Sequence, residues 1–260
     1  MSLTIDLTGR VALVTGGVRG VGLGITRALL EAGATVVTCA RSELEPVEGS
    51  THLTCDVRDP DAVKDLVDRV VAQHGQLDVL VNNAGGAPYA LAADAAARFH
   101  EKVTSLNLLA PLSLMQAANA VMQQQDAGHG AGGAIVNVSS VSALRPSPGT
   151  ASYGAAKAGL DSLTRTLAVE WAPKVRVNAI DVGLVLTEQT DLHYGGPAGV
   201  AAIEKTIPLG RLAVPEEVGA VAAFLASPLA SYVSGATLEC HGGGERPAFL
   251  TALDQAKEHE

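Results

Sequence analysis

A tyrosine and a lysine spaced four residues apart are candidates for acid–base chemistry. Tyr153 and Lys157 fall in a segment, residues 152–171, whose pattern predicts a long helix, so the two side chains share one face. A free tyrosine has a pKa of about 10, which is too high for efficient proton exchange near neutrality. A nearby ammonium favours the phenolate and lowers that pKa. The pair therefore predicts a proton donor and acceptor, although Y-x-x-x-K also occurs often by chance.

Ser140 ends an apolar segment shortly before this pair. Its hydroxyl could hydrogen-bond a substrate oxygen on which charge develops during a reaction. Tyr153 taken alone could equally be an ordinary half-buried helix tyrosine, so the catalytic interpretation depends on the other motifs in the chain.

A glycine-rich turn follows the first predicted strand. Residues 15–22 read T-G-G-V-R-G-V-G and lie between an apolar run, 11–15, and a predicted helix, 23–32. Glycines let the backbone approach a pyrophosphate, whose charge is favoured at a helix N-terminus. A purely structural strand-to-helix turn is the alternative, but dinucleotides bind at the first such turn of a doubly wound sheet. The candidate phosphate-binding residues here are Gly16, Arg19, Gly20, Val21 and Gly22.

Short apolar runs alternate with longer helical patterns along the chain. The expected strands are residues 11–15, 34–40, 52–56, 77–81, 134–139, 175–181 and 236–240, and the expected helices are 23–32, 60–73, 95–124, 152–171 and 216–226. Only 15 positions separate Arg41 from Asp56, and Pro46 and Gly49 lie between them, so a full crossover helix is not expected there. The pattern predicts an α/β fold in a single domain, residues 1–260: a doubly wound, Rossmann-type parallel sheet of about seven strands with helices on both faces. The core spans about residues 7–244, and 245–260 reads as a C-terminal tail.

Composition excludes several classes of protein. The 260 residues are 47% hydrophobic, 17% charged and 3% aromatic, which is unlike a disordered chain, a coiled coil or a collagen. A net charge of −9 argues against nucleic acid or an anionic membrane as a partner. The uncharged stretches 103–125 and 218–238 are too polar or too broken to span a membrane. Three cysteines without metal-ligand spacing, and no signal-peptide pattern, predict free thiols and a cytoplasmic location; no metal site is expected.

Several further motifs occur in a fixed order. Asn82–Gly85 reads N-N-A-G after the fourth predicted strand, Asn107 lies in S-L-N-L-L-A-P, V-N-A-I spans 177–180, and P-E-E-V-G-A-V-A-A-F-L-A-S begins at Pro215. Together with the glycine turn, Ser140 and Y-x-x-x-K, these motifs resemble the short-chain dehydrogenase/reductase family over about residues 7–244. The sequence departs from the family pattern twice: Val182 precedes Gly183 where proline is usual, and His241 replaces an aspartate. Val182 could loosen the nicotinamide-side loop, and His241 could affect the C-terminal turn or a subunit contact.

The resemblance implies a reaction and a catalytic set. The expected reaction is hydride transfer between C4 of a nicotinamide and a carbonyl or carbinol carbon of a small-molecule substrate. It implies that Tyr153 donates or removes the proton, Ser140 binds the substrate oxygen, and Asn107 holds a water near Lys157 that completes a proton relay. A dinucleotide-binding sensor without turnover is the rival interpretation, and a nucleotide-sugar epimerase or dehydratase fits the glycine spacing poorly.

The choice of cofactor depends on the end of the second strand. An NAD site would carry an acidic residue there, but the sequence has Ala40 followed by Arg41, with Glu43 two positions on. Arg19 and Arg41 would suit a ribose 2′-phosphate, so NADP(H) is preferred and NAD(H) stays possible; either arginine could instead be merely solvated. By resemblance, the further cofactor-binding residues are Asp56, Val57, Asn83, Ala84, Gly85, Gly183 and Thr187, together with Tyr153 and Lys157.

The substrate pocket and the assembly are expectations from the same resemblance. The pocket should form from residues 86–89, 142–144 and a mobile lid at about 185–207, where His193 adjoins Tyr194. The apolar helices at 103–125 and 151–168 suggest subunit packing in a homotetramer with 222 symmetry, or its dimer. The alternative is that both helices are simply buried against the sheet.

Overall fold

Seven parallel strands form one sheet in the computed structural model, which describes residues 4–125, 132–188, 190 and 195–257. The strand order is β3-β2-β1-β4-β5-β6-β7. From β1 the chain adds β2 and β3 on one side, and it then returns to add β4 to β7 on the other side of β1. The strands are β1 (Val11–Thr15), β2 (Thr35–Ala40), β3 (Thr51–Thr54), β4 (Val79–Asn82), β5 (Gly133–Val138), β6 (Val175–Val182) and β7 (Thr237–Cys240). This confirms the predicted doubly wound sheet of about seven strands.

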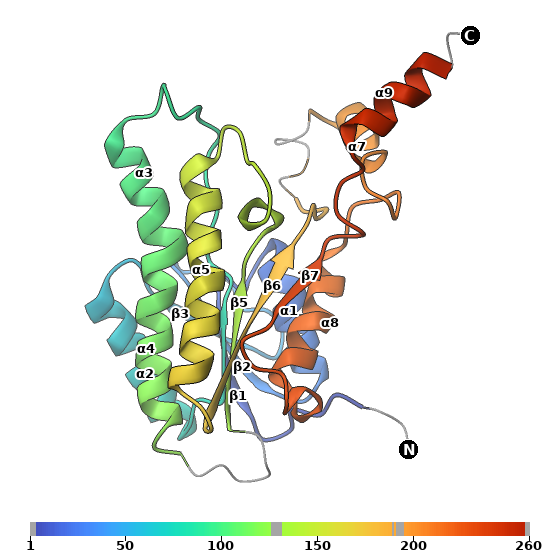
Figure 1. Cartoon of the computed structure of the whole chain (residues 1–260). Coiled ribbons are helices and arrows are strands. Elements are labelled where there is room, and N and C mark those ends of the chain that lie inside the picture. Colours follow the sequence, from blue (N-terminus) through green and yellow to red (C-terminus); the bar gives the residue numbers. More distant parts are fainter. Residues whose placement is uncertain (1–3, 126–131, 189, 191–194, 258–260) are drawn as a thin grey trace.

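Helices cover both faces of the sheet (Figure 1). On one face lie α1 (Gly20–Glu31) and α8 (Pro215–Ala226), and on the other α2 (Pro60–His74), α4 (Ala110–Met122) and α5 (Ala151–Glu170). β1, β4, β5 and β6 are buried at every residue. Continuously apolar runs are what a strand covered on both sides requires, and this is why their positions could be read from the sequence. In the described part of the chain, no helix is both long and apolar enough to cross a membrane.

Three elements differ from the expected ones. The helix expected over 95–124 is α3 (Ala97–Thr104) and α4, joined by a π-helical turn, η1 (Ser105–Leu109). The expected lid contains a short helix, α7 (Pro197–Glu204), and the expected tail contains α9 (Ala248–Lys257). Short 3-10 turns are η3 (Val141–Ala143) and η4 (Pro228–Ala230). No helix separates β2 from β3, as the short connection predicted.

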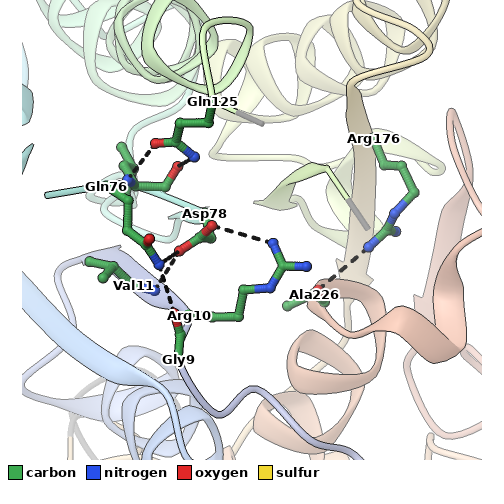
Figure 2. Close-up of polar contacts among 9 residues, drawn as sticks. Gly9, Arg10, Val11, Gln76, Asp78, Gln125, Arg176 and Ala226 are labelled. Atoms are coloured by element: carbon green, nitrogen blue, oxygen red, sulfur yellow. Dashed lines mark hydrogen bonds and ion pairs between the residues drawn. The ribbon is translucent and has the colours of Figure 1, made fainter. Parts of the chain in front are cut away.

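A hydrogen-bonded carboxylate ties the amino ends of β1 and β4 together (Figure 2). Asp78, only 7% exposed, accepts hydrogen bonds from Arg10 Nη1 (3.3 Å), the Val11 backbone N–H (2.8 Å) and Gln76 Nε2 (2.7 Å). Gln125 closes the same edge by pairing with both backbone groups of Leu77. Both oxygens of the buried Asp78 carboxylate therefore have donors, which is the condition under which a buried carboxylate can be tolerated.

Two glycines allow α1 and α8 to pack in direct backbone contact. A Cβ on Gly24 would lie 2.3 Å from the Pro215 carbonyl carbon, and a Cβ on Gly219 would lie 2.4 Å from the Gly24 oxygen. Because these neighbours are backbone atoms, neither helix could accommodate a methyl group without separating from the other. The helix pair in turn covers the face of the sheet beneath the glycine turn.

We expect Gly24→Ala to destabilise the fold by about 2 kcal/mol, since overpacking outweighs the gain in helix propensity of about 1 kcal/mol. Urea unfolding followed by circular dichroism measures the difference. Gly159→Ala in α5 is the matched control, because a Cβ there would meet only the flexible Leu108 side chain, at 3.1 Å. Equal midpoints for the two variants would contradict the proposed close contact.

Candidate functional site

A cavity of about 690 Å³ opens at the carboxyl ends of the strands. Parallel α/β sheets bind ligands at this edge, where the strand order reverses. Sixteen of the seventeen residues predicted from the sequence line the cavity, and only Asn107 does not. The lining set is Gly16, Arg19, Gly20, Val21, Gly22, Arg41, Asp56, Val57, Asn83, Ala84, Gly85, Ser140, Tyr153, Lys157, Gly183 and Thr187.

The glycine turn forms the cavity wall after β1. Gly16 and Gly20 have φ angles of +65° and +50°, and a Cβ on Gly22 would lie 2.1 Å from the Gly16 oxygen. Arg19 is the N-cap residue of α1, and its side chain makes no cap hydrogen bond. The first backbone N–H groups of α1 lack intrahelical acceptors, as at every helix start. This arrangement can bind an anionic group.

The residues after β4 are fastened to this turn. Asn83 Nδ2 donates to the Thr15 oxygen (2.9 Å) and the Gly16 oxygen (3.2 Å), while Thr15 Oγ1 accepts from the backbone N–H groups of Asn83 (3.0 Å) and Ala84 (2.9 Å). The Asn83 side chain is thus used to set the distance between two strand ends. Ala84 and Gly85 present their backbone to the cavity.

Arginines surround the end of the cavity beside β2 and β3. Arg19 and Arg41 are exposed and line it. Glu43, the nearest carboxylate after β2, accepts from Thr54 Oγ1 (2.8 Å). Arg58, which the sequence reasoning missed, also lines the cavity and donates to both carboxylate oxygens of Asp56. This hydrogen bonding lowers the pKa of Asp56 and raises that of Arg58. The only sequence signal for Arg58 was its place two residues after Asp56.

Lys157 lies deep at the opposite end of the cavity. Its side chain is 4% exposed, its Nζ donates to the Val138 oxygen (2.7 Å), and Nζ lies 5.6 Å from the centroid of the Tyr153 ring. Burial lowers the pKa of Lys157 to about 8, opposed by the charges of Asp161 and Asp181. Tyr153 and Lys157 share one face of α5, as their spacing predicted.

The pKa of Tyr153 differs from the sequence-based expectation. Burial raises it, and interaction with the Ser140 hydroxyl lowers it by less. The sequence predicted that the Lys157 ammonium lowers this pKa, whereas in the structure desolvation of the phenolate has the largest effect and raises it. Ser140, 9% exposed, is the second residue after the end of β5, and its Oγ accepts from the Ser142 backbone N–H (3.2 Å).

Asn107 is held in the π-helical turn and faces Gly86. Its Oδ1 accepts from the Gly86 backbone N–H (2.9 Å), and its Nδ2 donates to the Gly86 oxygen (2.9 Å) and the Val103 oxygen (2.8 Å). A Cβ on Gly85 would lie 2.7 Å from Asn107 Oδ1 and 3.4 Å from Lys157 Nζ. Asn107 and Lys157 therefore approach the same glycine, and the water relay stays a prediction.

The two departures from the family pattern lie side by side. β6 continues through Val182, which pairs with Cys240, and the Gly183 N–H donates to the Cys240 oxygen (3.0 Å). The backbone at Val182 is thus paired with β7, and a looser loop beyond Gly183 stays a prediction. His241 Nε2 contacts the Glu239 carboxylate, and a Cβ on Gly183 would lie 2.7 Å from the His241 Cα. His241 therefore belongs to the turn after β7.

A second cavity of about 480 Å³ adjoins the first at Gly183. Its walls include Leu144 from the predicted substrate region and Ile207 from the predicted lid, together with residues 245–248, which the sequence analysis assigned to a C-terminal tail. His193 and Tyr194 lie outside the described residues. Among the residues that the structure describes, no group of three His, Cys, Asp or Glu side chains could hold a metal ion.

Comparisons with known proteins show which family the chain belongs to. A family model described as Enoyl-(Acyl carrier protein) reductase matches residues 16–245. The chain is 40% identical to cis-4-hydroxycyclohexanecarboxylate dehydrogenase of Sinomonas cyclohexanicum over 90% of this chain and 96% of that protein. It is 36% identical to the 3-oxoacyl-(acyl-carrier-protein) reductase of Thermotoga maritima, covering 91% of this chain and 98% of the relative. The chain belongs to the short-chain dehydrogenase/reductase family.

Structural comparison supports the same assignment for this short-chain dehydrogenase/reductase. The crystal structure of a putative short-chain alcohol dehydrogenase from Sinorhizobium meliloti superposes with a TM-score of 0.83 at 36% identity, covering 93% of this chain and 98% of the other. The protein is therefore an oxidoreductase of this family acting on alcohol or carbonyl groups.

Gly85→Ala should lower kcat/KM by about tenfold or more, because the added methyl group displaces Asn107 or Lys157 from a geometry that tolerates little error. Steady-state kinetics measure the loss, and urea unfolding serves as the control for folding. Gly85 lies in a loop and does not need a positive φ angle, so stability should change little. An unchanged kcat/KM would show that this close approach does not matter to the site.

Proposed function

We propose that this oxidoreductase transfers hydride between NADP(H) and a carbonyl or secondary alcohol, with Tyr153 as the acid and base. The observation that carries the proposal is the single cavity that runs from Arg19 and Arg41 to Tyr153 and Lys157. This cavity connects an end that can bind an anion, at the two arginines, to an end that can carry out acid–base chemistry, at Tyr153 and Lys157. NAD-dependent alcohol oxidation by the same residues is the alternative for the cofactor.

The shape and charge of the cavity fit a dinucleotide. Gly22 admits no Cβ, so the backbone approach that a pyrophosphate requires is built into the turn. β2 ends at Ala40 rather than at a carboxylate, and Glu43 is engaged by Thr54. Arg41 and Arg19 can bind a 2′-phosphate through planar guanidinium groups. Asp56 and Val57 would lie beside the adenine, Asn83, Ala84 and Gly85 beside its ribose, and Gly183 and Thr187 toward the nicotinamide.

The proton chemistry follows from the buried end of the cavity. The nicotinamide, when bound, supplies or accepts the hydride. In reduction Tyr153 donates its phenolic proton to the substrate oxygen, and in oxidation it removes the carbinol proton. The Ser140 hydroxyl donates a hydrogen bond to the same oxygen, which stabilises the charge that develops there. The Lys157 ammonium stabilises the phenolate that Tyr153 becomes, and Asn107 holds a water for reprotonation from solvent.

The proposed assembly is a homotetramer, or its dimer, of a cytoplasmic protein. Leu109 between α3 and α4 is 52% exposed, and Val169 at the end of α5 is 80% exposed. Large apolar side chains on helices that also cover the sheet favour association of two copies along this face.

Tyr153→Phe should lower kcat about 100-fold or more, because the acid–base group is lost, while NADPH affinity stays within about threefold, since no charge is removed. Stopped-flow or steady-state absorbance of NADPH measures the rate. Tyr232→Phe, at a fully exposed tyrosine, is the matched control. A parent protein that binds NADPH yet turns over no ketone or alcohol would favour the sensor interpretation instead.

NADPH should bind about tenfold or more tightly than NADH, a difference of about 1.4 kcal/mol, as measured by parallel titrations of nicotinamide fluorescence. Arg41→Ala should remove most of this preference and leave NADH affinity nearly unchanged. Arg27→Ala changes the net charge equally but lies outside the cavity lining, paired with Glu216, so it should keep the preference. Equal or tighter NADH binding by the parent would overturn the NADP(H) assignment.

A further inference from the structure

Two buried carboxyl groups lie behind the catalytic lysine. Asp181 on β6 is 0% exposed, and Asp161 on α5 is 4% exposed. Within the described residues, neither oxygen of Asp181 has a hydrogen-bond partner, and Oδ1 of Asp161 also lacks one. Asp161 follows Lys157 by one helical turn, so both side chains project from the same face of α5.

The sheet register explains how the two carboxyl groups meet. Alternate side chains of β6 face α5. Val177 packs with that helix, and Asp181, four residues later, lies on the same side of the sheet. The Ser139 backbone N–H bonds the Ile180 oxygen, which places Ser139 next to Asp181, and its hydroxyl donates to the Lys157 backbone oxygen (3.4 Å). The two aspartates and Lys157 therefore surround the junction of β5, β6 and α5.

Asp78, at the amino ends of the strands, shows how a buried carboxyl group is satisfied. It accepts from a guanidinium, an amide and a backbone N–H (Figure 2). Near Asp181 the Ser139 hydroxyl and the Ser140 backbone N–H favour the charged form, but neither reaches hydrogen-bonding geometry. Two unpaired negative charges in such a place would be very costly, whereas one proton between two carboxyl groups relieves both the repulsion and the missing donor.

The surrounding charges are consistent with one net negative charge on the pair. Burial, together with the neighbouring Asp161 and Glu239, raises the pKa of Asp181 well above the ordinary value of an aspartate. Burial also raises the pKa of Asp161, whereas interactions with the Ser139 side chain, Arg165, Lys157 and Asp181 lower it. Both aspartates in turn raise the pKa of Lys157 against its own burial. From β7, Glu239 faces Asp181 in register and is itself in contact with His241.

We propose that Asp161 and Asp181 share one proton and together act as the single counter-charge that keeps the Lys157 ammonium charged. They are positioning residues for the reaction proposed above, and the inference rests on that function for its kinetic consequences. Lys157 is buried, and the only hydrogen-bond acceptor described for its Nζ is the neutral carbonyl of Val138. A shared-proton pair supplies the missing charge without placing two carboxylates side by side.

The coupling between proton binding and folding determines how the stability of the protein changes with pH. The pKa of Asp181 is raised in the folded state, so from a pH of about 4 upward the folded protein binds more protons than the unfolded chain until the shared proton is lost. Stability therefore falls as the pH rises through this window. Removing the carboxyl should abolish this loss and leave a protein that is at least as stable near pH 7.

The test compares Asp181→Asn, Asp161→Asn, the double variant and Asp78→Asn. Each single variant at the pair keeps one carboxylate, so the alkaline limb of kcat/KM should move by only a few tenths of a pH unit. The double variant loses the counter-charge, so this limb should move down by about one pH unit or more. Asp78→Asn should lose stability near pH 7 without moving the limb, because Asp78 lies at the other edge of the sheet.

Two readouts do not depend on turnover. Urea unfolding between pH 4 and 8 should show that Asp181→Asn loses the decline of stability with pH and is at least as stable as the parent near pH 7. Nuclear magnetic resonance of lysine labelled at Cε, with the Lys157 signal assigned from Lys157→Met, should show Lys157 titrating lower in the double variant. If the enzyme turns over no substrate, these results still decide the inference separately from the proposed function.

Destabilisation of Asp181→Asn near pH 7 as large as that of Asp78→Asn would overturn the shared proton. An unchanged Lys157 titration in a folded double variant would overturn the counter-charge. Should the double variant not fold, the unfolding profile of Asp181→Asn decides the proposal by itself.

Discussion

The site depends on a lysine ammonium held inside the protein. Lys157 Nζ is enclosed between the end of β5, where it bonds the Val138 carbonyl, and the loop after β4, where Gly85 gives it room. A buried cation is costly unless oxygen atoms and negative charge surround it. The strand that ends at Val138 continues directly into Ser140, so the same short segment that satisfies the lysine also places the second hydroxyl group of the site.

Glycines, rather than side-chain contacts, set the width of the cavity. Gly22 lies against the Gly16 carbonyl at the end beside β1, and Gly85 lies against Asn107 and Lys157 at the other end. Asn83 joins these ends by donating to Thr15 and Gly16. Each of these contacts involves backbone or a buried polar atom. The packed sheet therefore fixes the distance between the anion-binding end and the acid–base end of the cavity. A long ligand can bind both ends at once.

The sequence predicted the fold well where one signal was strong. Strands such as Val11–Thr15 are continuously apolar because both faces are covered, so their positions could be read within about two residues. The π-helical turn at Asn107 could not, since its residues have ordinary helical periodicity and it is tertiary hydrogen bonding to Gly86 that holds the side chain. The helix at Ala248–Lys257 was read as a tail because an isolated short amphipathic segment carries little information. The pKa of Tyr153 required knowledge of burial, which spacing does not provide.

The burial of Asp181 could not be predicted from the sequence. At the end of an apolar strand run, an aspartate is indistinguishable in sequence from one that leaves the sheet for solvent. Asp181 is fully buried and has no hydrogen-bond donor among the residues that the structure describes, whereas both oxygens of Asp78, at the amino ends of the strands, accept hydrogen bonds. Buried charge without partners lowers stability, and proteins concentrate such costs at functional sites. The contrast between the two ends of the strands therefore favours a structural role for Asp78 and, through Lys157, a part for Asp181 in the proposed chemistry.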